Sequence, residues 1–346
     1  MNAQFTQHNL IFKQASGTSR GVLTTKETYI LEISKNGQKG IGECAIFRGL
    51  SYDDVPDYEE KLTWLCKNIN LDFEVLKKEL LHYPSIIFGL EQALLNLEHG
   101  EDLYFPSDFT DGKDSIKING LIWMGNADFM QSQIEEKLAK GFDCIKLKIG
   151  VDWKSEKEII KKLREKFPKE QLELRVDANG AFSYEEASMV LQELADLGIH
   201  SIEQPIKKSE VRSPKSEENS EKKSTDCCIP WNKMARLCAE TPTPIALDEE
   251  LIGIIDFEEK KKLLETIKPQ YIILKPALVG GFSGSDEWIA IAESLGINWW
   301  ITSALESNIG LNAICQYTYT KKNPLPQGLG TGALFTNNFE THLQLE

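Results

Sequence analysis

Three carboxylate side chains stand at the ends of three consecutive apolar stretches of the sequence. Asp177 closes one stretch in RVDANG, Glu203 closes the next in SIEQP, and Asp248 closes the third in ALDEE. A single aspartate after a strand is most often a helix cap or a turn former, so none of the three is decisive alone. Together they would supply the oxygen ligands that Mg²⁺ prefers, with Mn²⁺ as a possible substitute. The sequence therefore predicts a divalent-metal site.

Lysines occur on the stretches that flank these carboxylates. Lys146 and Lys148 lie in CIKLKIG, and Lys275 lies in YIILKPA. Because residues two apart on a strand share a face, Lys146 and Lys148 point the same way, and we expect that way to be the interior of a barrel. The alternative is an edge strand that exposes both lysines to water.

A divalent cation beside lysines suits the removal of a proton from the carbon next to a carboxylate. That reaction creates an enediolate, whose negative charge needs a cation or preorganised hydrogen-bond donors. The base must be neutral near pH 7, and both burial and neighbouring positive charges disfavour the ammonium form of a lysine. Lys148 is therefore the predicted base.

The elements that position these residues recur at a nearly constant interval. Four of the five intervals between successive polar strand ends are 26 to 29 positions long, which fits one strand, one helix and two loops. The fifth interval, of 45 positions, contains the polar stretch 207–226, which we interpret as a solvated insertion. The strand-end residues used for these intervals are Lys148, Asp177, Glu203, Asp248, Lys275 and Ser303.

Residues 116–330 are thus predicted to form an α/β domain, a TIM-like (β/α)7β barrel with seven strands and the glycine-rich end QGLGTG. An open doubly wound sheet would also give a regular interval, but its ligand groups gather at one switch point. Polar residues at five successive strand ends favour the closed barrel, where all the ends meet at one mouth. The C-terminal tail, 331–346, is expected to return to the N-terminal part of the chain.

Residues 1–115 differ from the barrel segment and are predicted to form an α+β capping domain. Alternating apolar residues on both sides of an Asn-Gly pair indicate a β-hairpin over 29–44. Apolar residues at helical spacing indicate helices over 55–69 and 85–100.

The composition limits the class of partner. The chain has 346 residues with 53 acidic and 39 basic side chains, a formal net charge of −14 at pH 7. This charge opposes binding to nucleic acids and to anionic membranes, and no apolar stretch is long enough to span a bilayer. We expect a cytoplasmic enzyme, monomeric or homo-oligomeric, that acts on a small anionic substrate. The seven cysteines lack the spacing of a zinc or redox site and are interpreted as reduced thiols.

The ordered set of motifs resembles the muconate-lactonising-type branch of the enolase superfamily. It comprises KxK at 146–148, DAN at 177–179, EQP at 203–205, DEE at 248–250 and LKP at 274–276. That superfamily is known for a lysine or histidine base beside Mg²⁺, and its members pair an α+β capping domain with a (β/α)7β barrel. The resemblance implies that Asp177, Glu203 and Asp248 bind Mg²⁺ and that Lys148 is the base. Lys275 would then stabilise the intermediate from the opposite face, and Lys146 would keep Lys148 poised.

Within this branch, the segments TSALES and QGLGTGALF resemble the o-succinylbenzoate synthases. The implied reaction is the syn dehydration of 2-succinyl-6-hydroxy-2,4-cyclohexadiene-1-carboxylate in menaquinone biosynthesis. N-Succinyl amino acid racemases and dipeptide epimerases use the same two opposed lysines and remain the alternative, ahead of a non-catalytic barrel that only binds a ligand. The candidate substrate-binding residues are Arg20, Asn179, Gly280, Gly281, Ser303, Glu306 and Ser307. Glu43, in GIGECA, is interpreted as a structural residue near the domain interface.

Overall fold

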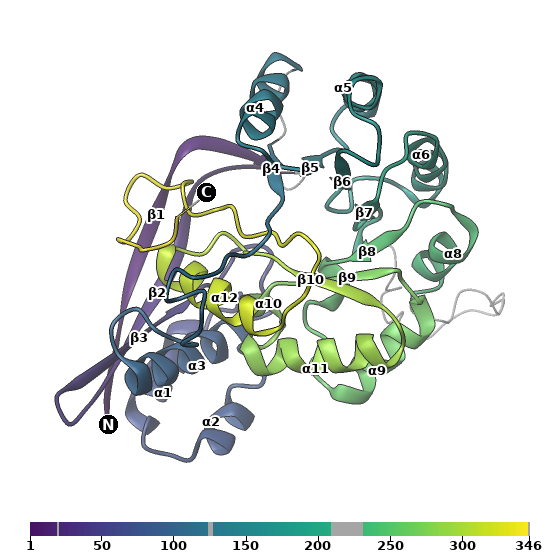
Figure 1. Cartoon of the computed structure of the whole chain (residues 1–346). Helices are drawn as coiled ribbons and strands as arrows, with labels where there is room; N and C mark the ends of the chain where they lie inside the picture. The colour runs from purple at the N-terminus through teal and green to yellow at the C-terminus, as the bar shows by residue number, and fades with distance from the viewer. Residues whose placement is uncertain (19–20, 124–126, 209–230, 345–346) are drawn as a thin grey trace, which may run out of the picture.

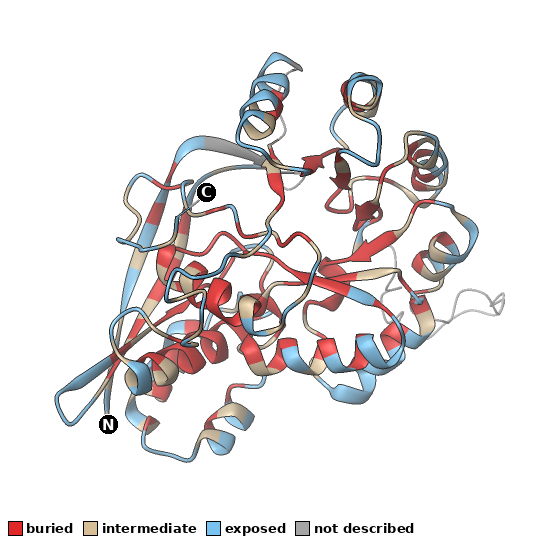
Figure 2. Ribbon diagram, in the orientation of Figure 1, coloured by how far each residue is buried: buried red, intermediate tan, exposed pale blue. Residues whose placement is uncertain are grey.

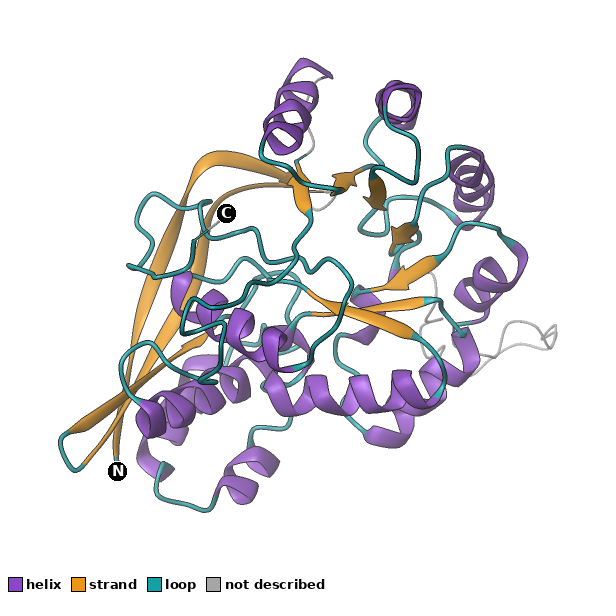
Figure 3. Ribbon diagram, viewed as in Figure 1, coloured by secondary structure: helices purple, strands orange, loops and turns teal. Residues whose placement is uncertain are grey.

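The computed structural model of the chain describes residues 1–18, 21–123, 127–208 and 231–344. Arg20 and all but the first two residues of the predicted insertion lie outside these ranges. Within the described residues, a three-stranded antiparallel sheet with its own helices stands beside a curved seven-stranded parallel sheet (Figures 1 and 3).

The N-terminal sheet has the strand order β1-β2-β3. Its strands are β1 (Asn2–Thr18), β2 (Gly21–Lys35) and β3 (Gln38–Cys44). Asn36 and Gly37 join β2 to β3 with φ angles of 53° and 83°, which are the positive values that a tight hairpin turn needs. The predicted hairpin is therefore confirmed. The long strand β1, which was not predicted, pairs with β2 on its other side.

Three helices cover one face of this sheet: α1 (Tyr58–Asn68), α2 (Phe73–Glu79) and α3 (Pro84–His99). Tyr29, Leu31 and Ile33 of β2 point into the cluster of apolar side chains between sheet and helices. Strand β3 approaches α3 so closely that a Cβ atom on Gly42 would lie 2.0 Å from the Gly89 oxygen. The predicted helices correspond to α1 and α3, whereas α2 was not predicted.

The opposite face of the N-terminal sheet lies against the barrel mouth and the C-terminal tail (Figure 1). Leu10 and Phe12 point to this side, and the ring of Phe335 from the tail lies 4.7 Å from that of Phe12. The tail also pairs with the free edge of β1, since the Lys13 amide donates to the Leu334 oxygen at 2.8 Å. A long unpaired strand edge invites association with other chains, and here the tail covers part of it.

The parallel sheet has the order β10-β9-β8-β7-β6-β5-β4, so neighbours in sequence are neighbours in space. Its strands are β4 (Gly120–Ile122), β5 (Cys144–Lys148), β6 (Glu173–Asp177), β7 (Ser201–Glu203), β8 (Ile245–Leu247), β9 (Tyr271–Leu274) and β10 (Asn298–Ile301). The helices that follow are α4 (Ala127–Ala139), α5 (Trp153–Lys166), α6 (Tyr184–Asp196), α8 (Asn232–Glu240), the 3₁₀ turn η2 (Glu249–Leu251), α9 (Phe257–Ile267), α10 (Pro276–Val279), α11 (Gly281–Ser294) and α12 (Asn308–Thr320).

A short segment after α12 closes the parallel sheet into a barrel. Gln327 forms a parallel bridge with Ile118, just before β4, and Gly328 forms one with Thr302, just after β10. Residues 327–328 thus occupy the place of an eighth strand between the two edges. The predicted (β/α)7β barrel with a capping domain is confirmed.

The strand residues that point outward hold the helices against the barrel. Ile145, Leu147 and Ile149 are buried in the large apolar cluster between strands and helices, and Figure 2 shows the buried residues on the strands and the inner helix faces. In the described part of the chain, no helix is both long and apolar enough to cross a membrane. The five cysteines described there are free thiols.

Candidate active site

The three predicted carboxylates and three predicted lysines meet at the carboxyl ends of the barrel strands. In the sheet register Lys148 lies beside Asp177, and Asp177 lies beside Glu203. Lys146 and Lys148 are only 7% and 9% exposed, so the strand that carries them is not an edge strand with its lysines in water. Their side chains point to the interior, as the alternating sequence predicts.

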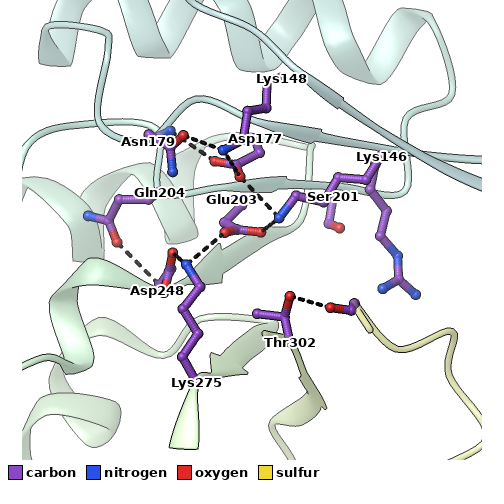
Figure 4. A network of polar contacts seen from close by, with 12 residues as sticks. Lys146, Lys148, Asp177, Asn179, Ser201, Glu203, Gln204, Asp248, Lys275 and Thr302 are labelled. Atoms are coloured by element: carbon purple, nitrogen blue, oxygen red, sulfur yellow. Dashed lines mark hydrogen bonds and ion pairs between the residues drawn. The ribbon is translucent and has the colours of Figure 1, made fainter. Parts of the chain in front are cut away.

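The lysines and carboxylates form one connected set of ion pairs (Figure 4). Asp177 Oδ2 lies 3.0 Å from both Lys146 Nζ and Lys148 Nζ. Lys146 also contacts Glu203, and Lys275 contacts Asp248. The three carboxylates lie between Lys148 on one side and Lys275 on the other (Figure 4).

Burial and mutual charge set the ionisation of this cluster. Burial favours the neutral form of Asp177, but the three lysines hold the pKa of Asp177 well below its usual range. Burial, together with the negative charge of Asp177, raises the pKa of Glu203 to about 8. The pKa of Lys275 is raised despite burial, because Asp248 and Glu203 stabilise its ammonium form. The lysines thus favour the ionised forms of Asp177 and Asp248, whereas Glu203 favours its protonated form near pH 7.

The carboxylates of Asp177, Glu203 and Asp248 fit a hard divalent cation, although lysine side chains contact all three in this structure. Among the described residues, no three His, Cys, Asp or Glu side chains stand in a ready-made arrangement around a metal position. The candidate ligands are nevertheless all carboxylate oxygens on neighbouring strands, which is the chemistry that Mg²⁺ prefers. Within the described part of the chain, the buried Glu203 Oε1 has no hydrogen-bond partner, and Lys275 Nζ lies 3.8 Å from it.

Asn179 connects the base candidate to the neighbouring loop. Its Oδ1 accepts a hydrogen bond from Lys148 Nζ at 2.6 Å, and its Nδ2 donates to Glu249 Oε1 at 3.2 Å. Asn179 also lines the pocket at the barrel mouth. The structure therefore places it next to Lys148 as well as next to the space for a substrate.

The pocket has an aromatic wall that the sequence analysis missed. Trp123 lies close to the base candidate, with Lys148 Nζ 5.9 Å from its ring centroid. Trp300 points inward like Thr302, two positions later, since alternate residues along a strand face the same side. This period of two could have identified Trp300 from the sequence. The lining residues are Phe47, Leu50, Asn119, Leu121, Trp123, Lys146, Lys148, Asp177, Asn179, Lys275, Trp300, Thr302, Ser303, Ala304, Leu305, Gly328, Gly330 and Thr331.

Four of the predicted substrate-binding residues have other surroundings. Gly280 and Gly281 are not among the pocket-lining residues. The N-terminus of α11 that they begin is filled by Glu91 from the capping domain, which accepts a hydrogen bond from the Phe282 amide at 2.5 Å.

Glu306 and Ser307 are fully buried behind the pocket wall. Their side chains bind protein groups, namely Ser303 and Glu43. Of the predicted set, Ser303 and Asn179 line the pocket, and Arg20 lies outside the described residues. The side chains of Glu306 and Ser307 therefore support the pocket wall, and direct contact of Gly280, Gly281, Glu306 and Ser307 with a substrate stays a prediction.

Together, fold and site define a class of protein: a capped barrel whose mouth holds opposed lysines with carboxylates between them. A family model described as enolase C-terminal domain-like matches residues 130–216 and 226–342. The o-succinylbenzoate synthase of Desulfotalea psychrophila is 41% identical over 379 aligned positions, which cover 100% of this chain and 97% of that protein.

Two solved structures are similar over nearly the whole chain. The crystal structure of MenC from Desulfotalea psychrophila has a TM-score of 0.82 at 40% identity and covers 99% of this chain and 97% of that one. A dipeptide epimerase from Enterococcus faecalis, complexed with Mg and L-Leu-L-Tyr, has a TM-score of 0.78 at 20% identity over 97% and 92% of the two chains. The second likeness shows the fold alone. The chain belongs to the enolase superfamily and, within it, to the o-succinylbenzoate synthase family.

Proposed function

We propose that this protein catalyses the Mg²⁺-dependent syn dehydration of 2-succinyl-6-hydroxy-2,4-cyclohexadiene-1-carboxylate to o-succinylbenzoate, the aromatising step of menaquinone biosynthesis. The observation that carries the proposal is the placement of Lys148 and Lys275 on opposite sides of three buried carboxylates. The identity of 41% over the whole chain to an o-succinylbenzoate synthase supports the choice of substrate. The protein would accordingly be a carbon-oxygen lyase.

The reaction uses Lys148 twice. Its neutral amine takes the proton from the carbon next to the substrate carboxylate, and the electron pair of the broken C–H bond becomes available to form the new double bond. The C–O bond to the hydroxyl group then breaks, and the same nitrogen returns its proton to the leaving hydroxide, which departs as water. Because one residue acts at both steps, proton and hydroxide leave from the same face.

The other residues hold the charge that develops. Asp177, Glu203 and Asp248 would bind Mg²⁺, with Mn²⁺ as a substitute, and the bound cation would supply positive charge next to the substrate carboxylate. Lys275 would stabilise the same negative charge from the other face. Lys146, which contacts Asp177 and Glu203, would keep Lys148 surrounded by positive charge.

A second candidate function is racemisation or epimerisation of N-succinyl amino acids or dipeptides. The same opposed lysines favour it, because two bases on opposite faces can remove a proton on one side and return it on the other. This alternative is also supported by the dipeptide epimerase that has the same fold.

The two functions are separated by assays of one protein preparation with Mg²⁺. We expect the purified protein to convert the cyclohexadiene carboxylate, which is followed by the absorbance of the aromatic product. Lys148→Ala should abolish this turnover while the fold is retained. Interconversion of N-succinyl amino acid or dipeptide enantiomers without any dehydration would establish the alternative. Turnover that survives in Lys148→Ala would remove Lys148 as the base.

A further inference from the structure

A buried polar network joins the capping sheet to the loop that follows β10. Its centre is Glu43, the fully buried residue near the end of β3. Glu43 Oε1 accepts hydrogen bonds from Thr28 Oγ1 at 2.8 Å and from the Ser307 amide at 3.0 Å. Glu43 Oε2 accepts from Ser307 Oγ at 2.6 Å and from the Gly310 amide at 2.9 Å. One carboxylate of the capping domain thus holds the start of α12.

On the barrel side, the same loop is tied together by Glu306. Its Oε2 accepts hydrogen bonds from Ser303 Oγ at 2.6 Å and from the Ala304 amide at 2.7 Å. Ser303 Oγ in turn accepts from the Leu305 amide and from Thr331 Oγ1, both at 2.9 Å. The Ser303 hydroxyl is thereby saturated, with its proton directed at Glu306 and not at the pocket.

This loop is a wall of the pocket and its backbone is strained. Ser303, Ala304, Leu305 and Thr331 all line the pocket. Leu305 has a φ of 63°, a left-handed conformation that is unfavourable for a leucine. Such a conformation persists only where the surrounding contacts enforce it. Here the Leu305 amide donates to Ser303 Oγ, which Glu306 holds, and Glu43 holds Ser307 two residues further on.

A buried lysine of the capping sheet accompanies the two carboxylates. Lys26 is 6% exposed and lies on the same face of β2 as Thr28. Its Nζ has no hydrogen-bond partner among the described residues. Burial lowers the pKa of Lys26, while the negative charges of Glu43 and Glu306 oppose that shift, so the three groups act on one another.

We infer that Glu43 is a positioning residue that holds the Ser303–Leu305 wall in the shape that binds the substrate. The capping domain would therefore control substrate affinity through the back of the wall, and not only by covering the mouth. The inference rests on the proposed function for its substrate. It does not depend on that function for the geometry of the wall.

Glu43→Gln tests the inference. The glutamine keeps one acceptor oxygen but sets an NH₂ group against N–H donors, so the wall loses at least one charged hydrogen bond. We expect KM for the cyclohexadiene carboxylate to rise about tenfold, with kcat changed by less than about threefold. Amide hydrogen exchange in the peptide 303–310 should become about tenfold faster. Thr28→Val removes one of the four hydrogen bonds to Glu43 and keeps the carboxylate, so it should change both quantities in the same direction by a smaller factor.

Gln316→Met is the matched control. Gln316 lies on the same helix α12 and also binds residues outside the barrel, since its Oε1 accepts from the Tyr104 and Phe105 amides at 2.8 and 2.9 Å. Its side chain bonds neither the wall residues nor Ser307 and Gly310, through which Glu43 acts, so KM and exchange over 303–310 should stay at the values of the unsubstituted protein.

Two results would overturn the inference. One is a folded Glu43→Gln protein with unchanged KM and unchanged exchange over 303–310. The other is an equal rise of KM in Gln316→Met, which would make the effect one of general destabilisation. If the unsubstituted protein does not dehydrate the proposed substrate, the proposed function fails, and the exchange comparison alone decides whether Glu43 anchors the wall.

Discussion

Lys148 Nζ donates a hydrogen bond to Asn179 Oδ1 over 2.6 Å, and this contact joins strand β5 to the loop after β6. Asn179 has a φ of 45°, the left-handed region that asparagine tolerates and glycine adopts freely. The amide of Asn179 also donates to Asp177 Oδ1 at 3.0 Å, a bond that any residue could make. The Asn179 side chain therefore orients Lys148, and its amide ties this contact to Glu249.

Asn179→Gly should remove that orientation without straining the backbone. We expect kcat to fall by about tenfold to a hundredfold, because a misplaced base loses the reacting geometry. Steady-state kinetics with the cyclohexadiene carboxylate gives the measurement. Asn36→Gly is the control, since Asn36 is an exposed turn residue with a φ of 53°. A kcat equal to that of the unsubstituted enzyme would show that Asn179 does not orient the base.

Removal of the metal should stop turnover and leave the fold intact. Lysines pair with Asp177 and Asp248, and the raised pKa of Glu203, about 8, favours its neutral form, so no bare buried carboxylate appears when a cation leaves. We expect EDTA to abolish dehydration while the circular dichroism spectrum persists, and added Mg²⁺ to restore activity and raise Tm.

Asp248→Asn supplies the counterpart to the EDTA experiment. The loss of one carboxylate should largely abolish the rise of Tm on addition of Mg²⁺. An unchanged rise would mean that the cation binds elsewhere, and unfolding by EDTA would show that the carboxylates are not neutralised without the cation.

Glu91 should make stability depend on pH. Burial raises the pKa of Glu91 to about 7, against hydrogen bonds from Ser283 and Phe282 that lower it, whereas the ordinary glutamate value is 4.5. Between these values the folded state keeps a proton that the unfolded state has lost, so the free energy of unfolding falls as pH rises through this window.

The comparison of Glu91→Gln with the unsubstituted protein isolates this effect. From about pH 4 to about pH 8, the free energy of unfolding of the unsubstituted protein should fall by about 3 kcal/mol relative to Glu91→Gln. Urea unfolding at a series of pH values measures it. Glu98→Gln, an exposed position of the same helix, should show no such difference. Parallel pH curves for all three proteins would contradict the shifted pKa of Glu91.

Lys26 and Glu306 should be energetically coupled. Lys26→Met removes the positive charge that opposes the raised pKa of Glu306, which should lower the free energy of unfolding. Adding Glu306→Gln removes one of the two carboxylates and should restore part of the loss. A double-mutant cycle by urea unfolding gives the coupling, and strictly additive effects would show that the two groups do not interact.

The sequence predicted the barrel because its evidence is periodic and local. The regular interval between strand ends, and the alternation of Lys146 and Lys148 with apolar residues, follow from the geometry of single βα units. The Asn36-Gly37 turn likewise depends on the conformations of two adjacent residues. The strand β1 escaped prediction because its mostly polar pattern has no single apolar side: Phe5 packs toward the helices, whereas Leu10 and Phe12 pack toward the tail and the barrel mouth.

The sequence by itself determined which chemical groups reach the barrel mouth, since strand order and the period of two place Asp177, Glu203 and Lys148 there. It did not determine which of the remaining candidates face the substrate. Only the tertiary structure decided that Glu91 fills the N-terminus of α11 and that Glu43 holds Ser307, contacts that span 191 and 264 positions of the chain. Such contacts depend on how the two domains pack against each other. This packing leaves no local pattern in the sequence, so the contacts cannot be predicted from the sequence alone.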